Sequence, residues 1–303
     1  GAAFTDSANI KDANTEAVDT LVALGVINGY TDGSFKPNGT VTRAEMAKMI
    51  YTIRSGGNSD ASAYNDDKTS FTDIGSHWAR GYIKYCQSLG IIAGKSNTKF
   101  CPNDKVTAQE AAKMLLVTLG YDATKAGLTG AGWASKTNAL ADENGLLKDV
   151  TTSFTAACPR QYAAQLIYNA IFAPTVVWRD DAYTNKTLMG NEDLPTVGEK
   201  FMGLKNPKGI LTSVKYDDND KTYTTKITTK FATDSNHKDD VMSFDATVDY
   251  SALMGQQVKA LYKEGKNGDD DTLYGVYATD KNKTVTTLVD DIDAYNGGFK
   301  VNG

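Results

Sequence analysis

Long apolar runs and cysteine are both scarce in this chain of 303 residues. No segment reaches the roughly 18 consecutive apolar residues that a membrane-spanning helix needs, so the sequence predicts no membrane span. The three cysteines, Cys86, Cys101 and Cys158, are too few and too scattered for a disulfide framework or a zinc site. We expect small apolar fillers or free thiols, and one disulfide bridge stays open as an alternative.

Catalytic motifs are also missing. The two histidines, His77 and His237, lie in unrelated segments, and neither Gly-x-Ser-x-Gly nor His-Glu-x-x-His occurs. Carboxylates are plentiful, so a cell-wall glycan hydrolase with two carboxylates stays open, although the short β region disfavours it. We therefore predict that the chain is not an enzyme and binds no cofactor or metal. Acidic clusters such as Asp269–Asp271 lack the ligand spacing of a calcium loop and indicate solvated turns.

The formal net charge is −5, which excludes bulk binding to nucleic acid or anionic lipid and leaves room for a local anion site. The 41% hydrophobic and 23% charged residues are typical of a soluble globular protein long enough for two domains. The opening "GAAFTDS" lacks the basic and apolar segments of a signal peptide. We expect either that none existed or that it was removed, and a start at Gly1 without Met favours trimming.

A loop followed by an amphipathic helix occurs twice. "GVINGYTDGSFKPNGTVTRAEMAKMI" begins at Gly25 and "GIIAGKSNTKFCPNDKVTAQEAAKML" begins at Gly90, an offset of 65 residues that also relates Arg43 to Ala108. Thr-x-x-Glu in both copies predicts a capping box at the start of the second helix, and Gly25 predicts a left-handed stop after the first.

A third, more divergent copy follows. Trp133 precedes Gly145 by 12 residues, as Trp78 precedes Gly90, and Arg160 falls where Arg43 falls. Repeats of this kind usually exist because one unit cannot bury its own apolar face.

The remainder of the chain is predicted to form β structure. Strand-like runs at 210–216, 223–231, 258–262, 273–277 and 284–289 are rich in Thr, Val and Tyr and are separated by acidic turns. The sequence thus predicts an α + β multidomain chain. An all-α module of three repeats fills 1–174 (about 1–56, 66–120 and 121–174), a connector fills 175–194, and a small antiparallel β domain fills 195–303. The closing "GGFKVNG" leaves open a β domain that is cut short.

The residues "FTD" (Phe4–Asp6 and Phe71–Asp73), "HWA" (His77–Ala79) and "LGVINGYTDGSFKPNGTVTRAE" resemble the S-layer homology domain family, which anchors bacterial proteins to the cell wall. The resemblance implies a pseudo-threefold helical spindle of three repeats with grooves between neighbouring prongs. It implies that these grooves bind secondary cell-wall polysaccharide, typically through a pyruvylated sugar end, or modified peptidoglycan. An extracellular place in the cell wall or S-layer follows, with other S-layer subunits as further partners.

Carried onto this chain, the resemblance implies the following ligand-binding residues: Arg43, Arg160, Asp6, Asp73, Trp78, Trp133 and Gly29. An arginine in the first turn of a helix adds a planar two-pronged donor to the positive dipole end, which suits a carboxylate on a sugar. Aspartates accept bonds from sugar hydroxyls, and an indole face can cover the apolar side of a ring. Ala108, where the family's arginine belongs, predicts one weak or silent groove.

Structural alternatives exist for each of these residues. Arg43 does not cap its helix, so it is either solvated or salt-bridged, or it contacts ligand. The tryptophans fit a core or groove wall, and the aspartates fit turns. If the arginines serve ligand alone, Arg43→Ala with Arg160→Ala should abolish binding and leave the thermal midpoint nearly unchanged. Adhesion or S-layer lattice assembly through the β domain is a further alternative function.

Overall fold

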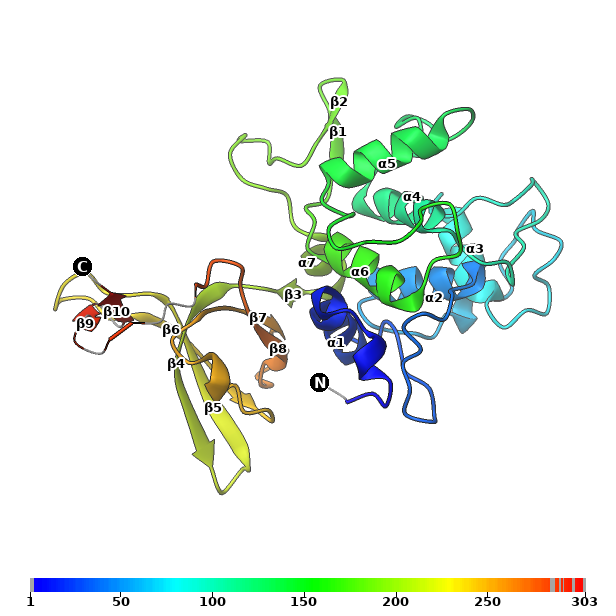
Figure 1. Ribbon diagram of the computed structural model, residues 1–303. Helices are drawn as coiled ribbons and strands as arrows, with labels where there is room; N and C mark the ends of the chain where they lie inside the picture. Colours follow the sequence, from blue (N-terminus) through cyan, green and yellow to red (C-terminus); the bar gives the residue numbers. More distant parts are fainter. Residues whose placement is uncertain (1–2, 284–286, 289, 291, 296–297, 302–303) are drawn as a thin grey trace. The chain divides into compact units, whose positions relative to one another are not determined.

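The computed structural model describes residues 3–283, 287–288, 290, 292–295 and 298–301. Backbone contacts divide the chain into a helical unit that ends at Gly203 and a β unit that begins at Leu204 (Figure 1). This mixture of helical and antiparallel β structure confirms the predicted α + β composition. Among the described residues, no helix has the length and apolar character to cross a membrane.

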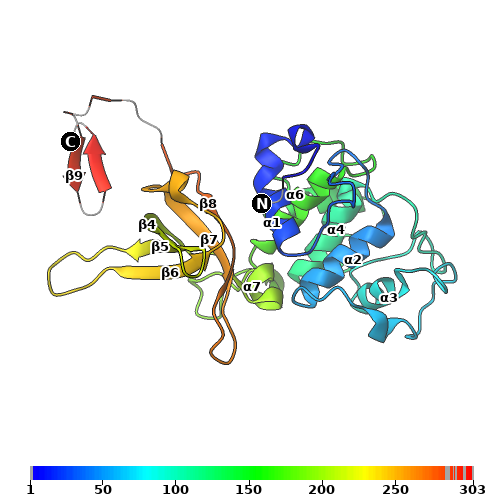
Figure 2. The same cartoon turned by 90° about the horizontal axis from the view of Figure 1, so that it is seen from below.

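The helices of the first unit match the repeated pattern of the sequence. Those described are α1 (Thr15–Ala23), α2 (Arg43–Arg54), α3 (Arg80–Ser88), α4 (Ala108–Leu119), α5 (Trp133–Glu143), α6 (Arg160–Ile171) and the short α7 (Val197–Met202). Helices α2, α4 and α6 carry most of the buried helical residues and lie close together in the interior of the unit (Figure 2). The other helices pack on them in turn: α3 on α2, α5 on α4 and α1 on α6. Each first helix therefore packs on the second helix of another unit.

A closed ring of backbone hydrogen bonds joins the segments that lead into the three inner helices. Val41 N donates to Cys158 O (3.0 Å), Cys158 N donates to Val106 O (2.9 Å), and Val106 N donates to Val41 O (2.9 Å). All three residues are buried, so these amides satisfy one another where water cannot reach them. The ring holds the three helix starts together at one place.

The local predictions for helix ends are confirmed. Thr42 and Thr107 each accept a hydrogen bond from the amide of the glutamate three residues on, and each glutamate accepts one from the amide of its threonine. Gly25, Gly90 and Gly145 follow α1, α3 and α5 with φ of 73°, 71° and 74°, a conformation that favours glycine.

The segment expected to be a connector contains ordered structure. Strands β1 (Val177–Arg179) and β2 (Ala182–Thr184) form a hairpin whose turn residues, Asp180 and Asp181, both have positive φ. Helix α7 lies beyond the expected connector, in the range predicted for the β domain (195–303), and packs against α2 and α6, so the helical unit extends to Gly203 and the β unit begins at Leu204. The sequence lacked a periodic pattern here because both elements are very short.

The second unit is a curled antiparallel sheet. Its strands are β3 (Leu204–Lys205), β4 (Lys208–Asp217), β5 (Thr222–Lys230), β6 (Asp240–Ala246), β7 (Gln257–Lys263) and β8 (Thr272–Ala278). The order is β3-β7-β4-β5-β6, and β8 also pairs with β7. Four of the predicted strands correspond to β4, β5, β7 and β8, whereas β6 was not predicted. Strands β9 (Ile292–Tyr295) and β10 (Gly298–Val301) form a separate pair. The predicted strand at 284–289 falls largely outside the described residues.

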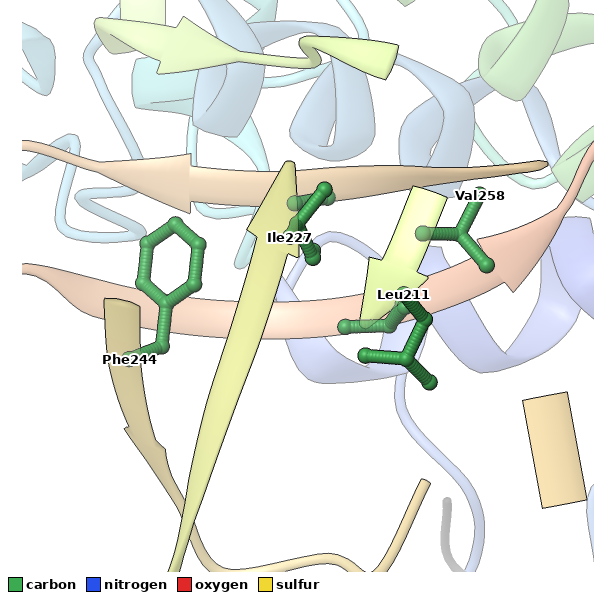
Figure 3. Packing of buried hydrophobic residues seen from close by; sticks show 6 residues of the cluster. Leu211, Ile227, Phe244 and Val258 are labelled. Carbon is green, nitrogen blue, oxygen red and sulfur yellow. The ribbon is translucent and has the colours of Figure 1, made fainter. Parts of the chain in front are cut away.

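One small core stabilises this sheet. Leu211, Ile227, Phe244 and Val258 from four different strands pack together with Ala260 and Val276 (Figure 3). Leu211, Phe244 and Val258 each lie between two more exposed neighbours, the pattern expected for a sheet with one buried face.

The three cysteines are free thiols, as the sequence indicated. Cys86 and Cys158 are buried, and burial raises the pKa of each thiol to about 12. They act as small apolar fillers beside the inner helices.

Candidate functional site

The predicted aspartates hold the loops that precede the inner helices. Asp73 accepts hydrogen bonds from the amides of Phe100 (3.0 Å) and Cys101 (2.8 Å). Partial burial raises the pKa of the Asp73 carboxyl, but these two amides outweigh it and leave the pKa below its ordinary range. Cys101 has a φ of 60°, so the carboxylate stabilises a tight turn.

Asp6 likewise holds the loop of the first unit, which precedes α2. It accepts from the amides of Phe35 and Lys36, both at 2.9 Å, and the Phe35 amide is the main reason that its pKa is lowered. Both aspartates therefore have backbone partners in the structure, and their contact with sugar hydroxyls stays a prediction.

Arg43 crosses from α2 to the loop of the second unit. Its side chain is 4% exposed, and it donates from Nε to Phe100 O (2.9 Å), from Nη2 to Ala93 O (2.7 Å) and from Nη1 to Glu110 Oε2 (2.8 Å). The guanidinium also stacks over the Phe100 ring at 4.5 Å. Burial lowers the pKa of Arg43 and Glu110 opposes that shift, so the group remains charged. Asp73 and Arg43 thus bind opposite sides of the Phe100 peptide.

Arg160 repeats this arrangement at the first loop. It is 6% exposed and donates from Nε to Phe35 O (2.9 Å) and from Nη2 to Asn28 O (2.5 Å). Phe35 and Asn28 correspond to Phe100 and Ala93 at the repeat offset of 65 residues. Each arginine therefore fastens the start of one helix to the loop of a different unit. Because both side chains are buried and hydrogen-bonded, the structure argues against the expectation that Arg43→Ala with Arg160→Ala would leave the thermal midpoint nearly unchanged.

A groove of about 480 Å³ lies beside the first two turns of α4. Its walls come from the loop of the second unit, from α4, and from the segment that leads into α5. The lining residues are Arg43, Ile91, Ala93, Gly94, Lys95, Thr107, Gln109, Glu110, Lys113, Met114, Thr129, Gly130 and Trp133. The volume suits one or two sugar rings, within the range typical of small-ligand sites.

The groove is cationic. Arg43, Lys95 and Lys113 face a single carboxylate, Glu110, whose Oε2 lies 2.8 Å from Arg43 Nη1 and 3.6 Å from Lys95 Nζ. The ammonium of Lys113 lies 5.5 Å from the ring centre of Trp133. Burial lowers the pKa of Lys113, Glu110 opposes this and Arg43 adds to it. An anion that enters the groove would therefore find more positive than negative charge.

The predicted aromatic and glycine residues separate into different places. Trp133 lines the groove, whereas Trp78 is 55% exposed, contacts His77 and Tyr82, and does not line this groove. Gly29 lies against Phe4, where an added Cβ would come within 2.5 Å of the ring. The structure thus brings Arg43, Asp73 and Trp133 together around the second loop. It brings Asp6, Gly29 and Arg160 together around the first.

The corresponding position on α6 is filled by the protein itself. Gln161 and Gln165, which correspond to Gln109 and Lys113, are 2% and 3% exposed. Gln161 Oε1 accepts from Lys11 N (3.0 Å), and Gln165 Oε1 accepts from Asn14 Nδ2 (2.9 Å). Arg43 and Arg160 each reach the loop of a neighbouring unit. By analogy, an arginine at position 108 would be directed toward this place beside α6, but Ala108 stands there.

Sequence reasoning missed Lys95, Gln109 and Lys113 as groove residues. A signal for Lys113 was present, because "AEMAKM" and "QEAAKM" carry lysine at the same repeat position, as Lys48 and Lys113. Lys95 had no such signal, since Tyr30 stands at its place in the first unit.

Comparison with known proteins agrees with this architecture. Residues 3–47 and 70–112 match the S-layer homology domain, and the third, more divergent unit lies outside the matched residues. The chain thus carries S-layer homology domains, as the resemblance indicated.

Its relatives are bacterial surface proteins. The chain is 30% identical over 157 residues to the middle cell wall protein of Brevibacillus brevis, a match that covers 51% of this chain and 14% of the relative. It is 28% identical over 319 residues to the surface-layer 125 kDa protein of Lysinibacillus sphaericus, covering 96% of this chain and 26% of the relative. A cellulosome-anchoring protein of Acetivibrio thermocellus is 29% identical over 110 residues, 35% of this chain and 24% of the relative. The chain thus spans about a seventh to a quarter of these relatives, which indicate an extracellular location at the cell wall or S-layer.

Proposed function

We propose that the helical unit anchors the protein to the bacterial envelope by binding acidic ends of secondary cell-wall polysaccharide. The observation that carries this proposal is the groove beside α4, in which three cationic side chains, one carboxylate and an indole line the same space. A sugar that carries a carboxylate, such as a pyruvylated end, meets both the charge and the flat apolar wall that it needs.

Different cations in the groove have different roles in this proposal. Arg43 is buried and already donates to Glu110 and two carbonyl oxygens, so it fixes the groove wall and contributes long-range positive charge. Lys95 is exposed and Lys113 is half-buried, and both carry long flexible stems, which leaves their ammonium groups able to reach a ligand carboxylate. Direct contact is therefore assigned chiefly to the two lysines and Trp133.

A second, related site is proposed beside α2. Arg160 holds the first loop as Arg43 holds the second, Lys48 stands at the place of Lys113, and Trp78 at the place of Trp133. Tyr30 stands at the place of Lys95, and the ammonium of Lys36 lies 4.1 Å from the Tyr30 ring centre. On α6, Gln165 stands where α2 and α4 carry a lysine, and both Gln161 and Gln165 are buried, which supports a silent third position. Two weak sites on one rigid unit strengthen attachment by raising the effective concentration.

The extent of the module follows from the same contacts. We propose that three units, at about 1–56, 66–120 and 121–174, act together as one wall-binding module. The ring formed by Val41, Val106 and Cys158 supports this, because each unit supplies one hydrogen-bond donor and one acceptor to the others. The β domain that follows is assigned to contacts with other S-layer subunits, and no catalysis is proposed for either part. Incubation of the whole chain with wall glycans tests the statement on catalysis, and no product should be released.

Charge reversal tests the groove. Lys95→Glu with Lys113→Glu should strongly weaken co-sedimentation of the whole chain with sacculi of the bacterium that produces it, and the site beside α2 accounts for any residual binding. Lys215→Glu with Lys226→Glu, two exposed positions in β4 and β5, makes the same change in net charge outside the groove and should sediment like the unmodified chain.

Sacculi from which the polysaccharide has been removed provide the second control. The unmodified chain should stay in the supernatant with them. Equal sedimentation of both double variants with intact sacculi, or equal sedimentation of the unmodified chain with stripped sacculi, would contradict the proposed site.

A further inference from the structure

An exposed tryptophan outside the repeats marks a second surface. Trp178, in β1, is 45% exposed and lies in the hairpin that projects beside α5 (Figure 1). The neighbouring Val177 is 37% exposed. The hairpin follows the three repeated units and is not part of the repeated pattern, so the groove does not explain why its aromatic residue faces solvent.

Trp178 is held in one orientation. Its cross-strand partner is Tyr183, with ring centres 5.0 Å apart and planes at 77°. Tyr183 also packs on Tyr121 at 4.6 Å, and its hydroxyl oxygen accepts a hydrogen bond from Asp122 N at 2.8 Å. Tyr183 therefore covers the end of α4, and Trp178 is presented on top of it. An indole fixed in this way loses little conformational freedom when a flat ligand stacks on it.

A cation completes this surface. The ammonium of Lys125 lies 4.4 Å from the ring centre of Trp178, and Lys125 itself is exposed. An indole with a lysine ammonium over its ring repeats the pairing in the groove, where Lys113 lies over Trp133. Such a pair suits a saccharide that offers one C–H face and nearby acidic or hydroxyl oxygens.

The surface is continuous with the groove along the chain. Lys125 lies in the α4–α5 connection, and Thr129 and Gly130 from the same connection line the groove. Hydrogen bonds from Ala126 N to Asp122 O (2.9 Å) and from Leu128 N to Ala123 O (2.7 Å) fold this connection into a compact turn. Gly130 is the fifth residue after Lys125, so the two places are no more than about 18 Å apart along the backbone.

We propose that Trp178 and Lys125 form a second subsite for the same polysaccharide. This subsite binds sugars further along the polymer, while the α4 groove binds the acidic end of the polymer. The inference rests on the proposed function, because the groove must hold the end of the polymer. A polymer that contacts both places gains affinity through the tether between them, and a short fragment does not.

The test compares ligand length. Wall polysaccharide released from sacculi is separated into a long fraction and a fraction of acidic-end fragments of about one to three sugars, and each is titrated into the whole chain. Trp178→Ala should weaken binding of the long fraction by about tenfold or more and leave that of the short fraction within about twofold. Trp178→Phe, which keeps a ring at this position, should recover part of the loss.

Two controls separate this inference from the groove itself. Tyr216→Ala removes a 53% exposed aromatic ring from β4 and should change neither titration. Lys95→Glu with Lys113→Glu should strongly weaken binding of both fractions. If Trp178→Ala binds the long fraction as tightly as the unmodified chain does, the proposed subsite is wrong, and the proposal for the groove is unaffected. An equal loss for both fractions would also overturn it, because Trp178 would then act through the groove. Failure of the unmodified chain to bind either fraction would refute both.

Discussion

Arg43→Met tests whether the buried guanidinium fastens the first two units together. Methionine keeps the unbranched stem over Phe100 and removes the charge and all donors. The substitution deletes three hydrogen bonds, of 2.7 to 2.9 Å, and leaves Phe100 O, Ala93 O and one oxygen of Glu110 without this partner. Hydrogen bonds to charged groups contribute about 1.5–3 kcal/mol each, and breaking a buried ion pair typically costs 3–5 kcal/mol.

These contributions are not additive, since the three acceptors share one side chain and Glu110 keeps its contact with Lys95. We expect a loss of about 3–5 kcal/mol in the free energy of unfolding, a large part of the roughly 5–15 kcal/mol typical of a domain. The assay is urea unfolding followed by helical circular dichroism, which reports on the unit that contains α1 to α7.

Arg80→Met is the matched control. Arg80 is only partly buried and donates from Nη1 to the nearby His77 O at 3.1 Å, so its loss should cost less than about 1 kcal/mol. If Arg43→Met lies within 1 kcal/mol of the unmodified chain, or no lower than Arg80→Met, the guanidinium does not stabilise the junction and the structural assignment fails.

Three further predictions concern the loop and helix of the second unit. Thr107→Ala removes one half of the capping box and should cost about 1 kcal/mol in urea unfolding, whereas Thr107→Ser should cost much less. Gly94→Ala would place a Cβ against the backbone oxygen of Ser96 and 2.6 Å from the Phe71 ring, so we expect a loss of at least about 2 kcal/mol and weaker binding, checked by unfolding and co-sedimentation. The pKa of Asp73 is lowered, so its carboxylate stabilises the fold at neutral pH, and this contribution is lost as the pH falls below about 4 and through the lowered pKa. Asp73→Asn should therefore lower the thermal midpoint at pH 7, and the difference from the unmodified chain should shrink as the pH is lowered through this range.

The sequence predicted features that depend on near neighbours. The capping boxes at Thr42 and Thr107 involve residues three apart, and Gly25 ends its helix through its own backbone freedom. Strands β4 and β5 were recognisable because one acidic turn separates two alternating runs. The repeat itself pointed to units that bury apolar surface against one another.

The destination of each arginine depends on the tertiary fold. Nothing near Arg43 in sequence indicates that its side chain reaches Phe100 and Ala93, because those residues belong to a different unit. Similarly, Glu110 was predicted as a cap from its spacing, and its Oε1 does accept from Thr107 N. Its second oxygen binds Arg43, a role that only the packing of α2 beside α4 creates.

The short elements were missed for a related reason. The β1–β2 hairpin has three residues in each strand, too few for a periodic signal, and Tyr183 is positioned by Tyr121 and Asp122 from far along the chain. Strand β6, with Asp240 at its start and Asp245 near its end, lacks the enrichment in Thr, Val and Tyr that marked its neighbours.

The central claim is that a cationic groove beside α4 recognises an acidic saccharide end. Calorimetric titration of the whole chain with a pyruvylated wall glycan, and with the same glycan after removal of the pyruvyl group, measures this directly. The account predicts saturable binding of the pyruvylated glycan that Lys95→Glu with Lys113→Glu strongly weakens, and no measurable heat with the glycan that lacks the pyruvyl group. Equal affinity for the two glycans, or binding that the charge reversal leaves unchanged, would contradict it.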